Sequence, residues 1–383
     1  MSDCDVKEFK LCELLKIYNG TKYDHLNKGD IPLYGSGGLM SHVDEALYSG
    51  EAILLPRKGT LSNIMYVNES FWTVDTMYYA VVNDKLADAF YLYSYLSQLD
   101  LSNLDSGSTL PSMTKSAYES IVVKLPDLKI QKAVATILFN IRKKLETNNK
   151  INQELEAMAK TLYDYWFVQF DFPDQNGKPY KSSGGKMVYN PELKREIPEG
   201  WGVSNLFDAA EVQYGYPFST DYFNSTGEGV PVIRIRDILG NDITNYSTEE
   251  VEDKYRINVG DVLIGMDGNF HMNYWIKENC YLNQRVVKVN SDKLPNMVLK
   301  YQIEPFIKLR EKSVSRTTVG HLSDKDLKAI NVILPKDKCL ASIFDKFESI
   351  LENIIINQQQ YQELTQLRDW LLPMLMNGQV KVE

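Results

Sequence analysis

The chain has 383 residues, a length that predicts two or three domains of ordinary size. Hydrophobic residues make up 44% and charged residues 24% of the chain, and these values argue against a disordered, collagen-like or disulfide-rich protein. The four cysteines form no CxxC pair, and no apolar run reaches the length of a membrane span. We therefore expect a folded cytoplasmic protein, whose net charge of −9 does not by itself favour nucleic acid.

Residues 1–128 are predicted to form a mixed domain of helices and strands. The apolar runs 52–55 and 78–82 indicate strands, and residues 86–99 indicate a helix. Between them lie segments rich in glycine, hydroxyl and basic side chains. Glycine lets backbone amides approach a phosphate closely, and basic side chains neutralise it. We assign as candidate DNA contacts in this domain Tyr34, Ser36, Arg57, Lys58, Thr60, Thr73, Asp75, Thr76, Ser108 and Thr109.

Residues 129–167 are predicted to form one long helix with an apolar seam. Alternating spacings of three and four residues connect Leu138, Ile141, Leu145, Asn148, Asn152, Leu155, Ala159, Leu162 and Trp166. A sustained repeat of 3.5 residues is typical of a coiled coil. Roughly 37 helical residues extend about 55 Å, which is longer than a domain of this size. Two amphipathic helices, each packed on its own domain, are the alternative.

Residues 168–196 are predicted to be a linker with little fixed structure, because turn-forming residues are frequent there. Within it, Pro173-Asp174 followed by Glu192-Leu193-Lys194 resembles the PD…ExK metal site of many nucleases. Such a site needs both carboxylates on adjacent β elements to bind Mg²⁺. No strand pattern surrounds either residue, so we interpret the segment as a solvated loop.

Residues 197–337 predict a second mixed domain with its own candidate contacts. Apolar and basic residues alternate in 230–237, so Arg234 and Arg236 are expected on one strand face, about 6.6 Å apart. That spacing suits neighbouring phosphates, or a phosphate and a guanine, although an ion pair with Asp237 or Asp242 is the alternative. Residues 214–218 predict an aromatic loop tip. Asn283 and Gln284 carry side-chain amides, which can pair with adenine. The assigned contacts are Tyr214, Tyr216, Arg234, Arg236, Asn283, Gln284, Arg285, Arg316 and Thr317.

Residues 338–377 predict a second long helix that repeats the first. Residues 108–167 align without a gap to 317–376 at a constant offset of 209, and 12 of the 60 positions are identical. Upstream the resemblance is weaker, and we align 49–54 with 259–264. We infer an internal duplication. The second seam reads Phe347, Ile350, Ile354, Asn357, Tyr361, Leu364, Arg368, Leu371 and Leu375.

The order of the segments predicts how the two helices pair. The first helix leads from the first domain toward the second, so the second helix can cover its seam only by running back. We therefore predict an α+β protein with two globular domains separated by two antiparallel coiled-coil helices. Asn148 and Asn357 occupy the same seam position near the expected two-fold axis. Buried amides at that position lower stability but fix register and orientation.

Enzyme motifs are missing from the sequence. It contains no GxxxxGK[ST], GxGxxG, HExxH or GxSxG, and no [DNS]PP[YF] loop of the adenine methyltransferases. Residues 1–125 hold 10 basic and 16 acidic side chains, and residues 201–335 hold 15 and 18. Because non-specific DNA affinity scales with the phosphates neutralised, this chain alone should bind DNA weakly. Partners would have to supply the cationic clamp.

Several motifs together resemble one family. They are Ile31-Pro32-Leu33-Tyr34-Gly35-Ser36-Gly37-Gly38, Leu55-Pro56-Arg57-Lys58-Gly59-Thr60, Phe71-Trp72-Thr73-Val74-Asp75-Thr76, Leu125-Pro126 with Gln131, Tyr165-Trp166-Phe167-Val168-Gln169-Phe170-Asp171-Phe172-Pro173, and Ile197-Pro198-Glu199-Gly200-Trp201. Over its whole length the chain is similar to the specificity subunit of type I restriction-modification systems. One departure is that Gln131, at the entry to the first helix, corresponds to Leu340 in the second.

The resemblance implies a function and a set of partners. Such subunits carry two target recognition domains, each reading half of a split double-stranded DNA sequence, with the helices as a ruler between them. They have no catalytic centre and no cofactor of their own. Two modification subunits, which use S-adenosylmethionine to methylate adenine, dock on the helices, and restriction subunits that use ATP and Mg²⁺ join them. The alternatives are a coiled-coil scaffold that binds only protein, and a divergent nuclease or methyltransferase.

Overall fold

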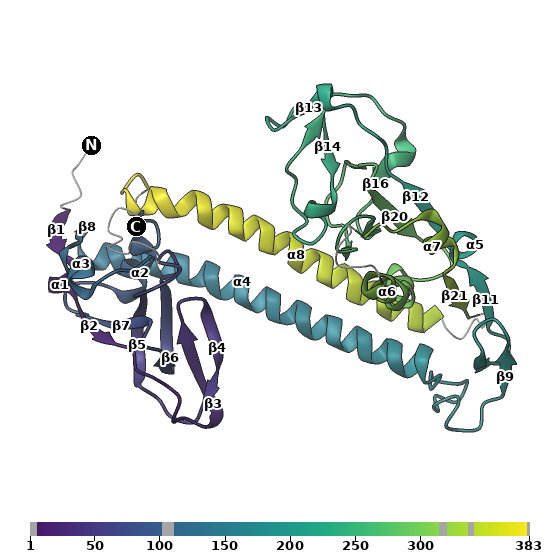
Figure 1. The fold of residues 1–383 in the computed structure, drawn as a ribbon, viewed down its shortest axis with the longest axis horizontal. Helices are drawn as coiled ribbons and strands as arrows, with labels where there is room; N and C mark the ends of the chain where they lie inside the picture. Colours follow the sequence, from purple (N-terminus) through teal and green to yellow (C-terminus); the bar gives the residue numbers. More distant parts are fainter. Residues whose placement is uncertain (1–5, 102–110, 314–319, 336–340, 381–383) are drawn as a thin grey trace. The chain divides into compact units, whose positions relative to one another are not determined.

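The computed structural model describes residues 6–101, 111–313, 320–335 and 341–380. The chain divides into two compact units, one made of residues 1–145 and 364–383 and the other of residues 146–363. Two long helices, α4 (Leu128–Tyr163) and α8 (Ala341–Met376), each contribute to both units (Figure 1). In the described part of the chain, no helix is both long and apolar enough to cross a membrane.

The first unit is built on a six-stranded sheet with the order β2-β7-β5-β6-β3-β4. Side chains alternate between the two faces of β5: Ile53 and Leu55 join the core that includes α2 and the start of α4, while Leu54 joins a separate core on the other face. The elements of this unit are β1 (Lys7–Lys10), α1 (Leu11–Leu14), β2 (Leu15–Asn19), β3 (Lys28–Gly35), β4 (Gly38–Val43), β5 (Tyr48–Pro56), β6 (Met65–Thr73), β7 (Met77–Val82), α2 (Ala89–Leu96), α3 (Lys115–Ser120) and β8 (Val122–Leu125).

The second unit distributes its strands over several smaller sheets. A four-stranded sheet has the order β12-β20-β17-β18, a five-stranded sheet has the order β13-β15-β14-β19-β16, and β9 pairs with β10 and β11 with β21. The elements are η2 (Asp164–Val168), β9 (Met187–Asn190), β10 (Arg195–Pro198), β11 (Gly202–Asn205), α5 (Leu206–Ala209), β12 (Glu211–Tyr214), η3 (Thr220–Tyr222), β13 (Phe223–Asn224), β14 (Val230–Ile233), η4 (Ile235–Asp237), β15 (Tyr246–Ser247), η5 (Asp253–Tyr255), β16 (Arg256–Ile257), β17 (Val262–Gly265), β18 (Met272–Tyr274), β19 (Cys280–Leu282), β20 (Val286–Asn290), α6 (Asn296–Ser313), α7 (Asp324–Lys328) and β21 (Asn331–Leu334).

One antiparallel strand pair has the same register in both units. In β5–β7, Ile53 lies opposite Ala80, and in β17–β20, Val262 lies opposite Val289. The residue numbers of Ile53 and Val262, and likewise those of Ala80 and Val289, differ by 209. The alignment of 49–54 with 259–264 is therefore wrong by one residue. A one-residue slip would turn every side chain to the other face of the sheet, whereas the offset of 209 keeps both Ile53 and Val262 in the core that includes the long helices.

The long helices pair along the predicted seams, and the pairing is antiparallel. In the first unit, Leu138 near the start of α4 shares a core with Leu375 near the end of α8. In the second unit, the ring of Trp166, just beyond α4, meets that of Phe347 near the start of α8, with centroids 5.8 Å apart. All seam positions are buried or half-buried. Since each helix packs on the other in both units, the alternative of separate packing is excluded.

Amide side chains occupy the seam where α4 and α8 meet in the second unit. Asn148 Nδ2 donates to Gln360 Oε1 at 3.3 Å and, at 3.5 Å, to the main-chain oxygen of Asn357. Asn357 Nδ2 donates to Asn152 Oδ1 at 3.1 Å, and Asn152 Nδ2 donates to the main-chain oxygen of Ile354 at 3.3 Å. Asn148 and Asn357 therefore do not pair side chain to side chain, because each amide bonds to a polar group one turn away.

The predicted linker is ordered, so the expectation of little fixed structure for 168–196 is wrong. Aromatic residues at its start are buried: the Phe172 ring stacks on Trp201 with centroids 4.9 Å apart and on Tyr180 with centroids 4.7 Å apart. Asp171 accepts hydrogen bonds from the Ser182 amide at 2.7 Å and from its hydroxyl at 2.5 Å. The end of the segment forms the hairpin β9–β10. Burial of large rings stabilises this stretch despite its turn-rich composition.

The nuclease-like pattern makes no metal site in this hairpin region. Asp174 Oδ1 accepts hydrogen bonds from the amides of Asn176 and Lys178 at 2.8 and 2.9 Å and so closes a turn. Glu192 lies in the turn between β9 and β10, where its amide bonds to Asn190 Oδ1. Over the described ranges, no group of three or more His, Cys, Asp and Glu side chains could hold a metal ion. Both carboxylates lie in turns, but the interpretation of the segment as a loop without strands is wrong around Glu192, which lies between the paired strands β9 and β10.

Candidate functional site

In the first unit, three segments assigned as candidate contacts meet where β3, β5 and β6 end. The Val74 amide donates to Tyr34 O at 3.1 Å, and the Arg57 amide donates to Thr76 O at 2.9 Å. Asn63 Nδ2 donates to Ser36 O at 2.8 Å. The strands therefore bring together segments 34–38, 57–60 and 73–76, as a shared role requires.

The side chains of this first cluster differ in their accessibility. Arg57, Lys58, Thr60 and Asp75 are exposed, while Ser36, Thr76 and Tyr34 are half-buried. Arg57 Nη1 donates to Asp75 O at 3.4 Å, which leaves the guanidinium at the surface. The Tyr34 hydroxyl donates to Glu69 at 2.9 Å, and burial together with this carboxylate raises the pKa of Tyr34 to about 12. Tyr34 is therefore a neutral hydrogen-bonding group at all ordinary pH values.

Thr73 is not a surface residue. Its side chain is fully buried, and within the described part of the chain Oγ1 has no hydrogen-bond partner. The neighbouring Trp72 and Val74 are buried as well, because β6 ends inside the core and the chain turns only at Asp75. The assignment of Thr73 as a DNA contact is therefore wrong.

In the second unit, the segment around Tyr214 and Tyr216 is part of the fold and not an exposed loop tip. The Tyr214 hydroxyl donates to Asp324 at 2.8 Å, and burial followed by this carboxylate raises its pKa. The Tyr216 hydroxyl donates to Glu249 at 3.0 Å, and its ring packs against Phe218, which is buried. The prediction of an aromatic loop tip is wrong, because Tyr216 and Phe218 belong to a small core of their own and Tyr214 packs against the main core of the unit.

Arg234 and Arg236 do not share a strand face. The strand β14 ends at Ile233, and residues 235–237 form the 3₁₀ turn η4. The buried Asp237 carboxylate accepts the Arg234 amide at 2.9 Å, a side-chain bond that ends the strand. The Arg234 guanidinium lies 4.6 Å from the centroid of the Phe223 ring, and Arg236 forms the alternative ion pair, with Nε 3.8 Å from Asp237 Oδ1.

The turn between β19 and β20 holds the remaining described contacts of this unit. The Asn283 amide donates to Ile233 O at 3.2 Å, so the turn lies beside the end of β14. Gln284 and Arg285 are exposed. Arg285 Nε lies 3.4 Å from Asp267 Oδ2, and Asp267 Oδ1 is bonded to His321 Nδ1 at 2.7 Å. The turn thus gathers amide, guanidinium and imidazole groups at one surface.

Asp267 and His321 were missed by the sequence reasoning. They are 54 residues apart and belong to no local motif. The only signal was the repeat: an offset of 209 carried upstream would have aligned Asp267 with Lys58, which was assigned as a contact. The alignment used there was shifted by one residue and hid the correspondence.

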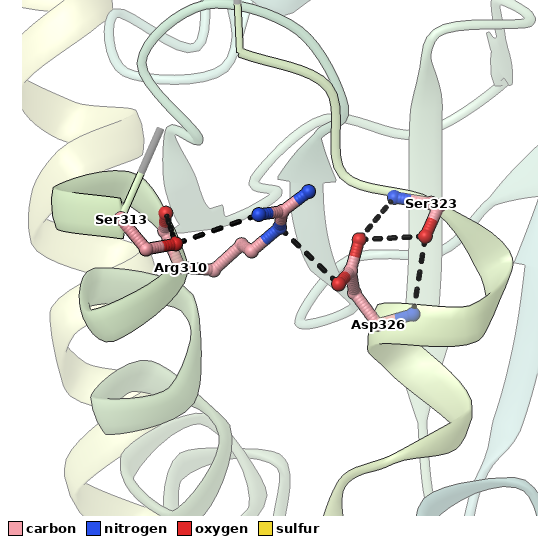
Figure 2. A network of polar contacts seen from close by, with 4 residues as sticks. All are labelled: Arg310, Ser313, Ser323 and Asp326. Carbon is pink, nitrogen blue, oxygen red and sulfur yellow. Dashed lines mark hydrogen bonds and ion pairs between the residues drawn. The ribbon is translucent and has the colours of Figure 1, made fainter. Parts of the chain in front are cut away.

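Four assigned residues, Ser108, Thr109, Arg316 and Thr317, lie outside the described residues. A polar network joins the described residues before Arg316 to those after Thr317 (Figure 2). Arg310 Nε in the last turns of α6 lies 3.2 Å from Asp326 Oδ1 in α7. Ser323 caps α7 by accepting the hydrogen bond of the Asp326 amide at 3.3 Å, while its own amide and hydroxyl donate to Asp326 Oδ2. Burial raises the pKa of Asp326, but the bonds from Ser323 and the charge of Arg310 outweigh it and lower the pKa below its usual value.

Comparison with known families gives two matches, one to each half of the chain. The family model for the type I restriction modification DNA specificity domain matches residues 4–157 and residues 198–366. Together the two matches cover more than half of the chain, and each contains one globular part with a stretch of one long helix.

Individual relatives agree with this match. The type I restriction enzyme MjaIX specificity subunit of Methanocaldococcus jannaschii is 27% identical over 297 residues, which cover 74% of this chain and 66% of the relative. The EcoBI specificity subunit of Escherichia coli is 28% identical over 173 residues, which cover 45% of this chain and 36% of the relative. The matched region is therefore less than two thirds of each relative's length.

A solved structure supports the fold. The crystal structure of a type I restriction-modification S subunit from M. genitalium superimposes with a TM-score of 0.68 at 15% identity. The superposition covers 98% of this chain and 97% of that one. At this identity the likeness concerns the fold, namely two mixed domains and a pair of long helices.

Proposed function

The chain belongs to the family of type I restriction-modification DNA specificity domains, and we propose that it is the non-catalytic subunit that reads a split double-stranded DNA target. Each globular part reads one half of the target. The helices α4 and α8 set the number of base pairs between the halves. A helix of 36 residues is about 54 Å long, which corresponds to roughly one and a half turns of DNA.

The observation that carries this proposal is the repeated strand pair surrounded by different residues. The pairs β5–β7 and β17–β20 share one register at an offset of 209, yet the candidate contacts around them differ in charge and type. One scaffold with two different surfaces suits a target whose two halves have different sequences. The exposed groups Arg57, Lys58, Gln284 and Arg285 are the strongest candidates for base or phosphate contact.

Partners complete the function in this proposal. Two modification subunits dock on the helices and methylate adenine with S-adenosylmethionine, and restriction subunits that use ATP and Mg²⁺ join them in the cytoplasm. In this proposal the cofactors bind to the partners. Its net charge of −9 is consistent with a division of labour in which the modification subunits provide most of the phosphate neutralisation.

The test is to map methylation in a host that expresses this chain together with its modification partner. The expected result is N6-methyladenine at one split motif. A second chain carries one additional heptad in each helix, a copy of 139–145 after Leu145 and a copy of 357–363 after Glu363. These insertions fall at the boundary between the units, so they leave the contacts within each unit unchanged.

The longer helices should lengthen the spacer by about three base pairs, because seven helical residues add about 10.5 Å. Both half-site sequences should stay the same. Changed half-sites with an unchanged spacer would contradict the ruler. Methylation without any sequence preference would favour a scaffold that binds only protein.

A further inference from the structure

Both units contain a junction of three chain segments with the same hydrogen bonds. In the first unit, the middle segment runs through Lys58 between the segments of Thr76 and Ser112. The bonds are Arg57 N to Thr76 O at 2.9 Å, Gly59 N to Pro111 O at 3.0 Å and Met113 N to Arg57 O at 2.9 Å. The second unit has Met266 N to Arg285 O at 3.0 Å, Gly268 N to Gly320 O at 2.9 Å and Leu322 N to Met266 O at 2.7 Å.

Every residue in these bonds differs from its counterpart by 209. The central glycines also correspond: Gly59 has φ +90° and Gly268 has φ +73°, in the left-handed region that favours glycine. The bridge between Lys58 and Ser112 has its counterpart in the bridge between Asp267 and His321. The junction is thus a repeated backbone frame that offers three equivalent side-chain positions in each unit.

The side chains at these three positions differ between the copies. The first unit has Lys58, Thr76 and Ser112, which are a cation and two hydroxyls. The second unit has Asp267, Arg285 and His321. The central side chain is therefore positive in the first unit and negative in the second. Beside it, the two hydroxyls of the first unit are replaced in the second by a guanidinium and an imidazole.

Asp267 contacts both of its neighbours. One carboxylate oxygen lies 3.4 Å from Arg285 Nε, and the other is bonded to His321 Nδ1 at 2.7 Å. The carboxylate is 30% exposed, whereas Arg285 and His321 are 53% and 49% exposed. Arg285 uses Nε for this contact, and over the described ranges its guanidinium has no other ion-pair partner. The contacts with Asp267 therefore leave the two terminal NH₂ groups of Arg285 and the Nε2 atom of His321 unused, on side chains that are about half exposed.

We propose that Asp267 is a positioning residue that presents Arg285 and His321 as one reading group for a guanine in the second half-site. The inference rests on the proposed function. A guanidinium fixed in orientation can pair with the O6 and N7 acceptors of guanine in the major groove. An unpaired carboxylate at this position would repel DNA, but here the Arg285 guanidinium balances its charge. Lys58, at the same position of the first unit, contacts DNA directly.

The experiment compares methylation maps of the wild-type complex with those of Asp267→Asn and of Arg285→Ala combined with His321→Ala. Each variant should relax one position of the second half-site and lower methylation of the original motif by about tenfold, the scale of one lost base contact. The first half-site serves as an internal control and should not change. Glu304→Gln, which removes the carboxylate from an ion pair with Lys308 on α6, is a matched control in the same unit.

The outcomes separate this inference from the proposed function. A wild-type complex without a split motif would overturn the proposed function itself. A wild-type split motif that Asp267→Asn and the double variant leave unchanged would overturn only the reading group. Uniformly weaker methylation with an unrelaxed motif would mean phosphate contact and would likewise overturn the base-reading role.

A structural role is tested separately. Adding Asp267→Ala to the Arg285→Ala, His321→Ala chain should cause no further loss of discrimination, because a positioning residue acts only through its partners. A further loss would contradict the proposal. Asp267→Asn could lower the melting temperature and so lose discrimination through instability. In that case the Arg285→Ala, His321→Ala chain, which keeps the Asp267 carboxylate, shows whether the two side chains read the base.

Discussion

The two units share an inner strand pair and differ outside it. Around β5–β7 the first unit adds β2 on one side and β6, β3 and β4 on the other to make one sheet of six strands. Around β17–β20 the second unit adds only β12 and β18 and places its other strands in separate sheets. The strand faces toward the long helices carry the same kind of apolar residues in both units. The difference teaches that the part next to the helices is held constant by packing, while the outer part is free to vary with the ligand.

The largest expected effect comes from equivalent seam positions in the two units. Leu138 and Phe347 correspond at the offset of 209, but only Phe347 meets two rings, those of Trp166 and Phe167. Phe347→Ala should lower the free energy of unfolding by about 3–5 kcal/mol, and Leu138→Ala by a smaller amount, about 2–3 kcal/mol. Urea denaturation followed by circular dichroism measures both. Equal losses would show that the aromatic contacts add nothing to the second unit.

An intermediate effect is expected at the start of α4. The buried Gln131 accepts the Asp88 amide at 3.1 Å and donates to Pro126 O at 2.8 Å and Leu86 O at 3.4 Å. The repeat has Leu340 at the equivalent position. Gln131→Leu should therefore destabilise the chain by about 1–3 kcal/mol, because it removes three hydrogen bonds to partly buried main-chain groups. A melting temperature equal to that of the wild type would mean that these groups find other partners.

The smallest effect is expected where amides replace apolar residues in the seam. Asn148 is buried and its Oδ1 has no partner among the described residues, while Gln360, which would lose its donor, is half-buried and can turn to water. Asn148→Leu should therefore raise the free energy of unfolding by about 0.5–1 kcal/mol. Asn357→Leu should not raise it, because it leaves Asn152 Oδ1 without its donor.

Both replacements should broaden the range of spacer lengths that the complex methylates, since the amides fix the register of the helix pair. Thermal unfolding and methylation maps report the two effects separately. A lower melting temperature for Asn148→Leu would contradict the register role.

The seams and the repeat could be predicted because a period of 3.5 residues and a gapless offset survive in the sequence itself. Strands such as β7 were predicted from their apolar composition. The order of 168–196 could not be predicted, because it comes from rings that meet only in the folded chain, such as Phe172 and Trp201. Local rules also cannot show which competing interaction wins, as at Arg234, where one carboxylate ends a strand.

The candidate site was only partly predictable for the same reason. The sequence identified segments that the fold brings together, such as those of Tyr34, Arg57 and Thr76, because turn residues and basic side chains stand next to each other in them. It assigned the buried Thr73 to the surface, since one residue decides on which side of a strand end a side chain lies. It also missed Asp267, whose partners come from distant segments.

The shared junction glycines have a consequence for how such a chain can change. Gly59 and Gly268 mark points at which the backbone geometry of the two halves is interchangeable. The segment between the glycine and the next junction residue, Thr76 in the first unit or Arg285 in the second, can be replaced by a segment of different length. The junction hydrogen bonds themselves stay in place. Under the proposed function, recombination at these fixed borders would create new DNA specificities, and the same borders would be the cutting points for hybrid proteins.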